Sequence, residues 1–587
     1  MHKNLRSLIE QLRKEKEIKE IPAEVDPYLE LAEIHRRVVE EEGPALFFSR
    51  VKGSDFPVVT NLFGTVRRME MAMGPKPEAI IGKAVQALDK LLPPRLKNLW
   101  EEKDWLLDIA KCGMRRVPAA KAPILENRMH KVDLHKLPVL TSWQEDGGAF
   151  FTLPLVYTEK PGTPEHNLGM YRMQVYSENQ TGMHWQIHKG GGFHYFEAEK
   201  AHQALPVTVF LGGPPALTIA AITALPEPLP ELLYASFLMG DKLDMVQVKG
   251  HPHPLVAEAE FALCGQVLPG VRRPEGPFGD HYGYYSLIHD FPVFDVHQLY
   301  HRKDAIYPAT IVGKPRQEDY YIGEWMQDLL SPVFPLLMPG LKTLWTYAEA
   351  GFHTLTAAIV RESYFREALA HSFRILGEGQ LSLTKVLLIT NVDVNLQDFP
   401  VLLKNILMRF NPARDLIVIH DTAMDTLDYT GRKYNQGSKA IMMGLGEPVR
   451  SLPLQYNGGA IPGINKLKPY CDGCLLISGA GYETAPDVAD YIIKDLPEEL
   501  IDWPLVILLD DVDLINTQTD FLWTVFTRFD PVLDIYARQT VLRNVIQYEL
   551  PIIIDARMKP DYPAALEPRE DIVQQVDRRW SSLFRPL

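Results

Sequence analysis

Cysteine is scarce in this chain, with only 4 among 587 residues. So few cysteines exclude a small disulfide-stapled scaffold and are typical of a reducing compartment, so we expect a cytoplasmic protein. Cys471 and Cys474 form a single CxxC pair, with no second pair and no His pair nearby. A lone CxxC most often places two thiols beside a turn, so we assign this pair no metal or redox role.

The chain is also poor in basic residues relative to acidic ones, with 61 Lys and Arg against 75 Asp and Glu and a net charge of −14. Affinity for nucleic acid depends on clustered Lys and Arg that neutralise phosphates. The acidic balance therefore argues against nucleic acid as a partner.

No stretch has the pattern of a membrane span or of a signal peptide. The longest run without a charge, residues 205–226, contains Gly212-Gly213-Pro214-Pro215 at its centre, which would leave backbone groups unpaired in lipid. We predict two buried strands separated by a turn there. At the N-terminus, apolar residues recur at helical spacing, which predicts an amphipathic surface helix. These residues are Leu5, Leu8, Ile9 and Leu12.

The pattern of apolar and turn residues changes along the sequence, which predicts an α+β multidomain fold. Residues 1–125 alternate helical periods with short strand-like runs, as in an α/β module. Residues 126–325 carry short β-branched and aromatic runs between Pro, Gly and Asn, which predicts an antiparallel sheet or barrel. Residues 326–587 alternate buried-strand runs with helical patterns, which predicts a C-terminal α/β domain. The runs predicted as strands in the middle region include TLPLVYT, VTVFLGG, FALCGQVL, YYSLI and FDVHQLY.

A weak internal repeat lies in the C-terminal region. Residues 392–415 and 512–534 both run from a Val-Asp pair through a Phe to an Arg-Phe-Asn/Asp-Pro turn. This spacing is compatible with a duplicated strand–helix–turn unit, although such pairs are also common in unrelated α/β proteins.

Convergent polar groups are concentrated in the middle region. A strand over residues 166–172 would place Asn167 and Tyr171 on one face and Arg172 on the other. His188, Asn167 and a carboxylate could form an oxygen and nitrogen site for a hard or borderline divalent ion. His188 could equally be a structural histidine.

Two glycine-containing segments are further candidates. Lys189 precedes Gly190-Gly191-Gly192, where the backbone could approach a phosphate or simply form a flexible turn. Glu275 and Asp280 lie in a loop rich in Gly and Pro, as acid–base chemistry requires, because neighbouring like charges separate their pKa values. A solvated turn with ordinary acidic residues is the alternative.

Six segments taken together carry a resemblance. In order and spacing they resemble the UbiD family of reversible decarboxylases. The segments are Thr60-Asn-Leu-Phe-Gly64, Asn167-Leu-Gly-Met-Tyr-Arg172, Trp185-Gln-Ile-His-Lys-Gly190, Pro226-Glu-Pro-Leu-Pro-Glu231, Glu275-Gly-Pro-Phe-Gly-Asp280 and Val312-Gly-Lys-Pro-Arg-Gln-Glu-Asp319.

The resemblance implies a central split β-barrel that binds prenylated FMN together with Mn²⁺ and K⁺. Asn167, His188 and Glu231 match the metal ligands, and the metal would bridge the cofactor phosphate to the protein. The segments expected to line the flavin contribute Met170, Tyr171, Arg172, His184, Trp185, Gln186, Lys189 and Gly190. His184 stands where hydroxybenzoate-type members tend to have Arg, so the phosphate contact there is expected to be weaker or to fall on Lys189.

Arg172, Glu275 and Asp280 match the catalytic network of the family. In that mechanism the cofactor bonds to the substrate carbon and accepts an electron pair as carbon dioxide leaves, and a protein acid then supplies a proton. We expect Asp280 to be this acid, and Arg172 to orient the substrate carboxylate and hold Glu275 ionised. One carboxyl would then be neutral and the other charged.

The substrate expected from the resemblance is a hydroxylated aromatic carboxylic acid. The length of the chain and the segment Thr181–Lys189 look most like the branch that decarboxylates a 1,4-dihydroxy-6-naphthoate in menaquinone biosynthesis by the futalosine route. A 4-hydroxybenzoate or polyprenyl-hydroxybenzoate decarboxylase is the alternative, with peripheral membrane contact only if the substrate is prenylated. Other classes stay open: an inactive flavin-binding assembly subunit, or a plain FMN oxidoreductase. The expected partners are a flavin prenyltransferase as cofactor supplier and further copies of the chain in a homo-oligomer.

Overall fold

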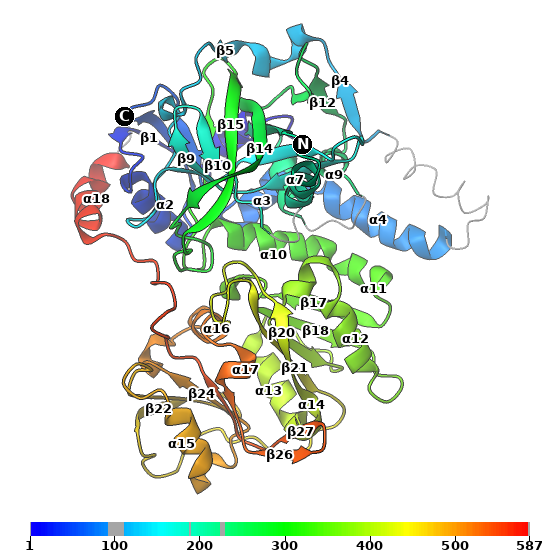
Figure 1. Cartoon of the computed structure of the whole chain (residues 1–587), viewed down its shortest axis with the longest axis vertical. Coiled ribbons are helices and arrows are strands. Elements are labelled where there is room, and N and C mark those ends of the chain that lie inside the picture. Colours follow the sequence, from blue (N-terminus) through cyan, green and yellow to red (C-terminus); the bar gives the residue numbers. More distant parts are fainter. Residues whose placement is uncertain (1, 92–110, 187–189, 224–228, 585–587) are drawn as a thin grey trace. The chain divides into compact units, whose positions relative to one another are not determined.

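The computed structural model describes residues 2–91, 111–186, 190–223 and 229–584 (Figure 1). The chain forms two compact units, one of residues Met1–Leu329 with Ala564–Leu587 and one of residues Leu330–Pro563. The sequence predicts residues 326–587 as one C-terminal domain, but Ala564–Leu587 belong to the first unit. Their helix α18 (Glu570–Leu583) packs against α2 (Glu30–Glu40) and β1 (Ile18–Val25). The three-domain division itself stays a prediction.

A small sheet opens the first unit. Its strand order is β1, β2 (Ala45–Val51), β3 (Val58–Thr60) and β16 (Tyr307–Pro308). The helices of this part are α1 (Leu5–Lys14), α2, α3 (Val66–Met73) and α4 (Lys76–Leu91). All four apolar residues predicted for the N-terminal amphipathic helix are buried along one side of α1, which confirms that helix.

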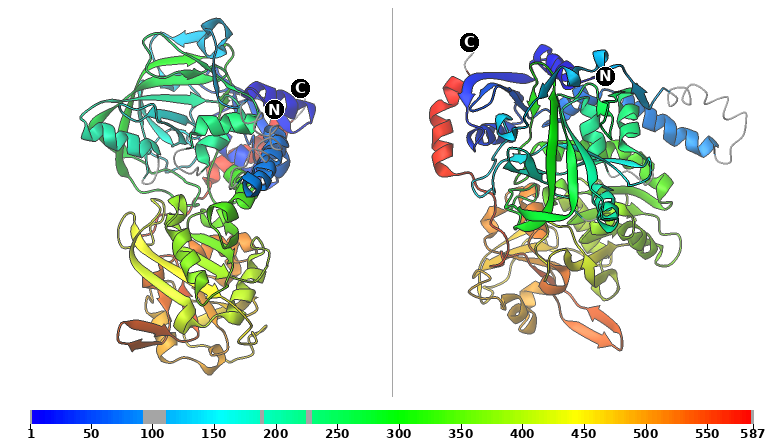
Figure 2. Two further views of the ribbon diagram at one scale, coloured as in Figure 1. Left: turned by 90° about the vertical axis from the view of Figure 1, so that its right-hand side faces the viewer. Right: turned by 45° about the horizontal axis from the view of Figure 1, so that its top comes forward.

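A curled antiparallel sheet of nine strands forms the centre of the first unit, and its two longest strands are adjacent (Figures 1 and 2). The path is β6 (Phe150–Phe151), β9 (Met173–Ser177), β10 (Gln180–Gly182), β15 (His289–His301), β14 (Phe261–Glu275), β11 (Leu205–Leu211), β7 (Leu155–Glu159) and β8 (His166–Met170), with β5 (Asn127–Met129) paired to β15. Helix α7 (Gly190–Lys200) packs across β7, β8, β11 and β14. This sheet confirms the prediction of an antiparallel middle region.

Beside the curled sheet lies a three-stranded sheet of β13 (Leu255–Val256), β12 (Leu243–Val246) and β4 (Met114–Arg116). Helix α9 (Glu231–Met239) packs against β12, β4 and β8. Helix α10 (Glu318–Leu330) ends this part of the chain. Among the described residues, no helix combines the length and the hydropathy that a membrane span requires.

Three local predictions in the first unit are wrong. The sequence predicts two strands over residues 205–226, but only the first exists as β11, and helix α8 (Pro215–Ile222) follows it. Pro214 and Pro215 explain this, because proline fits the first turn of a helix, where no N–H is needed. The run YYSLI forms no strand; Tyr284 and Tyr285 make only isolated bridges. The strand predicted over residues 166–172 ends at Met170, so Tyr171 and Arg172 lie between β8 and β9. Of the glycine run, Gly190–Gly192 form the first turn of α7.

The second unit contains two five-stranded sheets with the same order and the same pattern of directions. The first sheet runs β17 (Leu341–Thr346), β18 (Leu355–Val360), β19 (Val386–Thr390), β21 (Gln436–Gly444) and β20 (Leu416–Ala423). The second runs β22 (Ile464–Cys471), β23 (Cys474–Gly479), β24 (Leu505–Leu509), β28 (Ile552–Asp555) and β25 (Ile535–Tyr536). In each sheet the three middle strands are parallel and both edge strands are antiparallel to their neighbours.

The helices of the second unit repeat in the same way. Helices α13 (Phe399–Arg409) and α14 (Pro412–Asp415) precede β20, and α16 (Gln518–Phe526) and α17 (Pro531–Asp534) precede β25. The first residues of α13 and α16 are 119 positions apart and are hydrogen-bonded, since the Phe399 N–H donates to Gln518 Oε1. The other helices are α11 (Phe334–Leu337), α12 (Glu367–Leu376) and α15 (Val488–Lys494). The hairpin of β26 (Gln539–Leu542) and β27 (Val545–Tyr548) projects from this unit (Figure 2).

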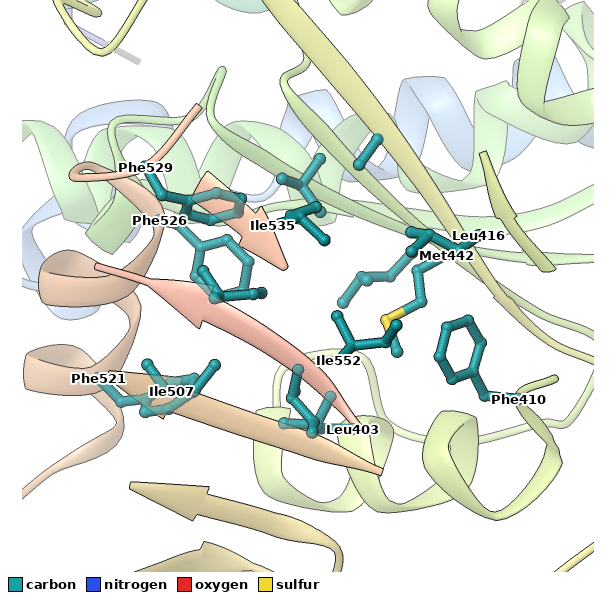
Figure 3. A pocket seen from close by; sticks show the side chains of 15 residues that line it. Leu403, Phe410, Leu416, Met442, Ile507, Phe521, Phe526, Phe529, Ile535 and Ile552 are labelled. Atoms are coloured by element: carbon teal, nitrogen blue, oxygen red, sulfur yellow. The ribbon is translucent and has the colours of Figure 1, made fainter. Parts of the chain in front are cut away.

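The two sheets share one hydrophobic core, and a small cavity of about 40 Å³ lies within it (Figure 3). Matching positions of the two halves line this cavity together, and all of them are apolar. Three matched pairs are Val386 with Leu505, Phe410 with Phe529, and Leu416 with Ile535. Equal strand order, equal spacing and a shared core are what a duplicated unit would produce, and the duplication itself stays a proposal.

Candidate active site

Arg172 is the centre of a buried polar network in the first unit. It lies between the end of β8 and the start of β9 and belongs to neither strand. The guanidinium donates from Nε to Glu275 Oε1 at 3.1 Å, from Nη1 to Asp280 Oδ2, and from Nη2 to Ser286 Oγ at 3.1 Å. The structure thus brings together the three residues predicted to be catalytic, although more than 100 positions separate Arg172 from Glu275.

His184 extends this network. Its Nδ1 lies 2.8 Å from Glu275 Oε1, and its Nε2 lies 3.3 Å from the Gln186 amide nitrogen. Burial lowers the pKa of His184, and the positive charge of Arg172 lowers it further, so the ring is neutral. A neutral ring that donates from Nδ1 to the carboxylate and accepts at Nε2 from Gln186 satisfies both contacts. His184 therefore supports Glu275 here.

Both carboxyl groups of the network are ionised. Burial acts to raise the pKa of Glu275, but His184 and Arg172 outweigh it and the pKa is lowered. Burial acts in the same way on Asp280, and Arg172 together with His281 outweighs it, so this pKa is also lowered. The expectation of one neutral and one charged carboxyl is therefore not met in this state, because one guanidinium contacts both groups.

Asp280 has a second basic neighbour. Asp280 Oδ1 accepts from the backbone N–H of His281 at 2.7 Å and lies 2.7 Å from His281 Nδ1. The His281 side chain is 29% exposed, whereas that of Asp280 is 11% exposed. The imidazole therefore connects a buried carboxylate to the surface of the unit.

Two of the predicted metal ligands lie on neighbouring elements. Asn167 is buried in β8, and Glu231 is the first residue of α9. Glu231 Oε2 accepts from the Leu168 N–H at 3.1 Å, which ties α9 to the residue after Asn167. Burial raises the pKa of Glu231. The third predicted ligand, His188, lies outside the described residues, within which no group of three or more His, Cys, Asp or Glu could hold a metal ion.

Three of the predicted flavin-lining residues, Tyr171, Trp185 and Gly190, lie at the start of α7. Tyr171 Oη accepts from Asn167 Nδ2 and from the Gly191 N–H, both at 3.3 Å. A Cβ at Gly190 would lie 2.1 Å from Asn167 Oδ1, so only glycine allows this approach. Trp185 is buried, and its Nε1 has no hydrogen-bond partner among the residues that the structure describes. Met170 is half-buried at the end of β8, and Lys189 lies outside the described residues.

Sequence reasoning missed the residues that hold the loop with Glu275 and Asp280. The Gly276 N–H donates to Gln174 Oε1 at 2.9 Å, and the Phe278 N–H donates to Ser286 Oγ at 3.1 Å. Asp146 accepts from the Gly279 N–H at 2.8 Å. The Asp146-Gly147 turn signal is visible in the sequence, but nothing in it indicates which loop the turn contacts.

Comparison with known protein families places these motifs in one family. Models described as 3-octaprenyl-4-hydroxybenzoate carboxy-lyase domains match three segments of the chain. The N-terminal domain model matches residues 9–88, the Rift-related domain model residues 115–315 and the C-terminal domain model residues 320–444.

Individual proteins agree with these matches. A Chlamydia pneumoniae protein, named as a subunit of 4-hydroxybenzoate decarboxylase, is 50% identical over 584 residues, covering 99% of this chain and 98% of its own. Vanillic acid decarboxylase of Sedimentibacter hydroxybenzoicus has a similar fold, with a TM-score of 0.67 and 22% identity over 78% of this chain and 96% of its own. HmfF of Pelotomaculum thermopropionicum, solved in complex with prFMN, has a TM-score of 0.62 and 23% identity over 79% of this chain and 98% of its own. The chain belongs to the UbiD family of carboxy-lyases.

Proposed function

We propose that this protein catalyses the non-oxidative, reversible decarboxylation of a hydroxylated aromatic carboxylic acid with prenylated FMN. The observation that carries the proposal is the buried contact of one guanidinium, Arg172, with two carboxylates, Glu275 and Asp280. A guanidinium is suited to bind a carboxylate in a bidentate manner, and two acidic groups beside it can hold and move a proton.

The residues present fit the cofactor and its metal. Asn167 and Glu231 supply an amide oxygen and a carboxylate, which are ligand types that Mn²⁺ accepts, and His188 would complete the set. Trp185 Nε1 is a buried donor with no partner in the part of the chain that the structure describes, and the glycines that open α7 lie close to it and to Asn167, since a Cβ at Gly190 would lie 2.1 Å from Asn167 Oδ1 and one at Gly191 2.6 Å from Trp185 Nε1. We propose this region for the flavin phosphate, Mn²⁺ and K⁺. When bound, the cofactor supplies an electron sink for the pair released by decarboxylation.

In this reaction each side chain of the network has a separate role. The C–C bond to the carboxylate breaks, carbon dioxide leaves, and the ring carbon takes up one proton from Asp280. Because Asp280 is ionised beside Arg172, it must gain a proton first. An incoming substrate carboxylate competes for the guanidinium and raises the pKa of Asp280, and His281 is placed at 2.7 Å to deliver the proton. Glu275 stays ionised and holds Arg172 in place.

Two substrate classes are supported by different features of the chain. The length of the chain and the segment Thr181–Lys189 favour a 1,4-dihydroxy-6-naphthoate-type acid of menaquinone biosynthesis. The name of the Chlamydia pneumoniae relative favours 4-hydroxybenzoate as the second candidate. Both acids carry a hydroxyl and a carboxylate on an aromatic ring, so the same network could act on either.

A substrate panel tests the proposal. The full chain, loaded with prenylated FMN and Mn²⁺, would be incubated with hydroxybenzoates and hydroxynaphthoates labelled with ¹³C at the carboxylate, and the released carbon dioxide measured. We expect release from at least one hydroxylated acid, and a naphthoate-only response would identify the first substrate class. A protein that retains modified-flavin absorbance and exchanges carbon dioxide with no aromatic acid would contradict the proposal and favour the inactive assembly role.

A further inference from the structure

Hydrogen bonds from another segment of the chain hold the backbone of the loop that carries Glu275 and Asp280. The Gly147 N–H donates to Pro277 O at 2.8 Å, and the Gln174 amide donates to Gly147 O at 2.6 Å. These contacts join this loop to the turn over residues 142–147. The position of Asp280 therefore depends on a turn that contains no predicted catalytic residue.

Asp146 makes the contact nearest to the proposed acid. Its Oδ2 accepts from the N–H groups of Ser142 and Trp143, both at 2.9 Å, which closes the turn. Its Oδ1 accepts from the N–H of Gly279 at 2.8 Å, one residue before Asp280. Three backbone donors on one carboxylate make it a rigid link between the two segments.

Trp143, in the same turn as Asp146, also packs closely against the loop that carries Asp280. A Cβ at Gly279 would lie 2.1 Å from Cδ1 of its indole, and a Cβ at Gly313 would lie 2.7 Å from Cζ2 of the same indole. The indole Nε1 donates to Val312 O at 2.9 Å, and Arg36 lies over the ring at 4.2 Å. The turn that Asp146 closes is thus packed so closely on this loop that a shift of the turn would move Gly279.

We propose that Asp146 is a positioning residue for the reaction, whose carboxylate fixes the backbone at Gly279 and thereby places the Asp280 carboxylate against Arg172. The catalytic part of this proposal rests on the proposed function. It assigns a role to a residue that lies outside the network of Arg172, Glu275 and Asp280, since the hydrogen bonds of its side chain among the residues described go to backbone N–H groups.

The Asp146 carboxyl changes its charge within the physiological pH range. Burial raises the pKa of Asp146 to about 7, although its three backbone donors and Arg172 act to lower it. The other charged or titratable groups near it are Glu145 in its own turn, Tyr285 and Arg36. Above pH 7 the carboxylate accepts all three N–H groups, and below pH 7 one oxygen carries a proton. Ionisation of Asp146 should therefore make activity rise as the pH rises through about 7, whereas the need for a protonated Asp280 makes activity fall as the pH rises, so the two groups act with opposite sign.

The test compares Asp146→Asn with the matched control Glu145→Gln, which removes an exposed carboxylate from the same turn. At pH 8 we expect kcat of Asp146→Asn to fall about tenfold, as the loss of one charge-assisted hydrogen bond gives, with KM changed less than about twofold. The acid limb near pH 7 should be present in wild type and in Glu145→Gln and absent in Asp146→Asn. Wild-type kcat with a retained acid limb in Asp146→Asn would overturn the proposal.

A second readout is independent of activity. Hydrogen–deuterium exchange of the peptide that covers residues 275–284 should be faster in Asp146→Ala than in wild type or Glu145→Gln, because alanine leaves the Gly279 N–H without its side-chain acceptor. Unchanged exchange in that peptide would overturn the positioning role. If wild type decarboxylates no acid of the panel, the proposed function fails, and the exchange comparison still decides whether Asp146 fixes this loop.

Discussion

The contact of Arg172 with Glu275 and Asp280 predicts a large loss of stability when the guanidinium is removed. Arg172 is 8% exposed and Glu275 is fully buried, so Arg172→Met would leave an unpaired carboxylate in the interior. Breaking a buried pair by removal of one partner costs about 3–5 kcal/mol. Arg115→Met is the matched control, because Arg115 pairs with Asp244 at the surface of the same unit, where water screens the charges.

The pH dependence of this loss has a defined sign. The folded-state pKa values of Glu275 and Asp280 are lowered, so their contribution to stability is present above the unfolded-state pKa of about 4 and is lost as pH falls through the folded-state values. In Arg172→Met the buried carboxyls lose their counter-charge and take up protons as the pH falls. The difference in unfolding free energy between wild type and variant should therefore be largest near pH 8 and shrink towards pH 4.

Urea denaturation followed by tryptophan fluorescence at pH 8 and pH 5 would measure this difference. The double variant Arg172→Met with Glu275→Gln should recover part of the loss, because the unpaired charge is then gone. An Arg172→Met loss as small as that of Arg115→Met, or one that does not change between pH 8 and pH 5, would refute the reasoning.

Three further predictions follow from other contacts. Glu231→Gln should lower the Mn²⁺ bound per chain, measured by metal analysis, and unchanged metal content would remove Glu231 from the ligand set. Gly190→Ala would bring a Cβ within 2.1 Å of Asn167 Oδ1, so the purified protein should retain less flavin by absorbance; full retention would contradict the close approach. Ala440→Val should raise the thermal midpoint, because it fills part of the roughly 40 Å³ cavity and makes Ala440 more like Ile552 at the matching position; a lower midpoint would show that the cavity cannot accept the added methyl groups.

The sequence predicts those parts of the fold that depend on local pattern. Parts of the long strands β14 and β15 follow from the β-branched and aromatic runs FALCGQVL and FDVHQLY, and the amphipathic helix α1 follows from the helical spacing of its apolar residues. The prediction fails at α8, where an apolar run fits a buried helix as well as a strand and only Pro215 at the helix start distinguishes them. Periodicity cannot separate these two cases in a run of this length.

Some residues of the candidate site could likewise be predicted from the sequence, and others could not. Family motifs identify Arg172, Glu275 and Asp280, and the structure places them in contact. Asp146 could not be found, because its role depends on a hydrogen bond to Gly279 across 133 positions. The ionised state of Asp280 could not be found either, since it depends on distances to Arg172 and His281 that no spacing in the sequence reports.

The most direct test of the central claim is the release of labelled carbon dioxide by wild type and by Asp280→Asn, both loaded with prenylated FMN and Mn²⁺. Asparagine keeps the shape of the side chain but cannot donate the proton of a carboxyl group. We expect wild type to release carbon dioxide from a hydroxylated aromatic acid, and Asp280→Asn to retain the flavin absorbance while releasing none above background. Release at the wild-type rate by Asp280→Asn would contradict the assignment of the network as the acid–base centre of this carboxy-lyase.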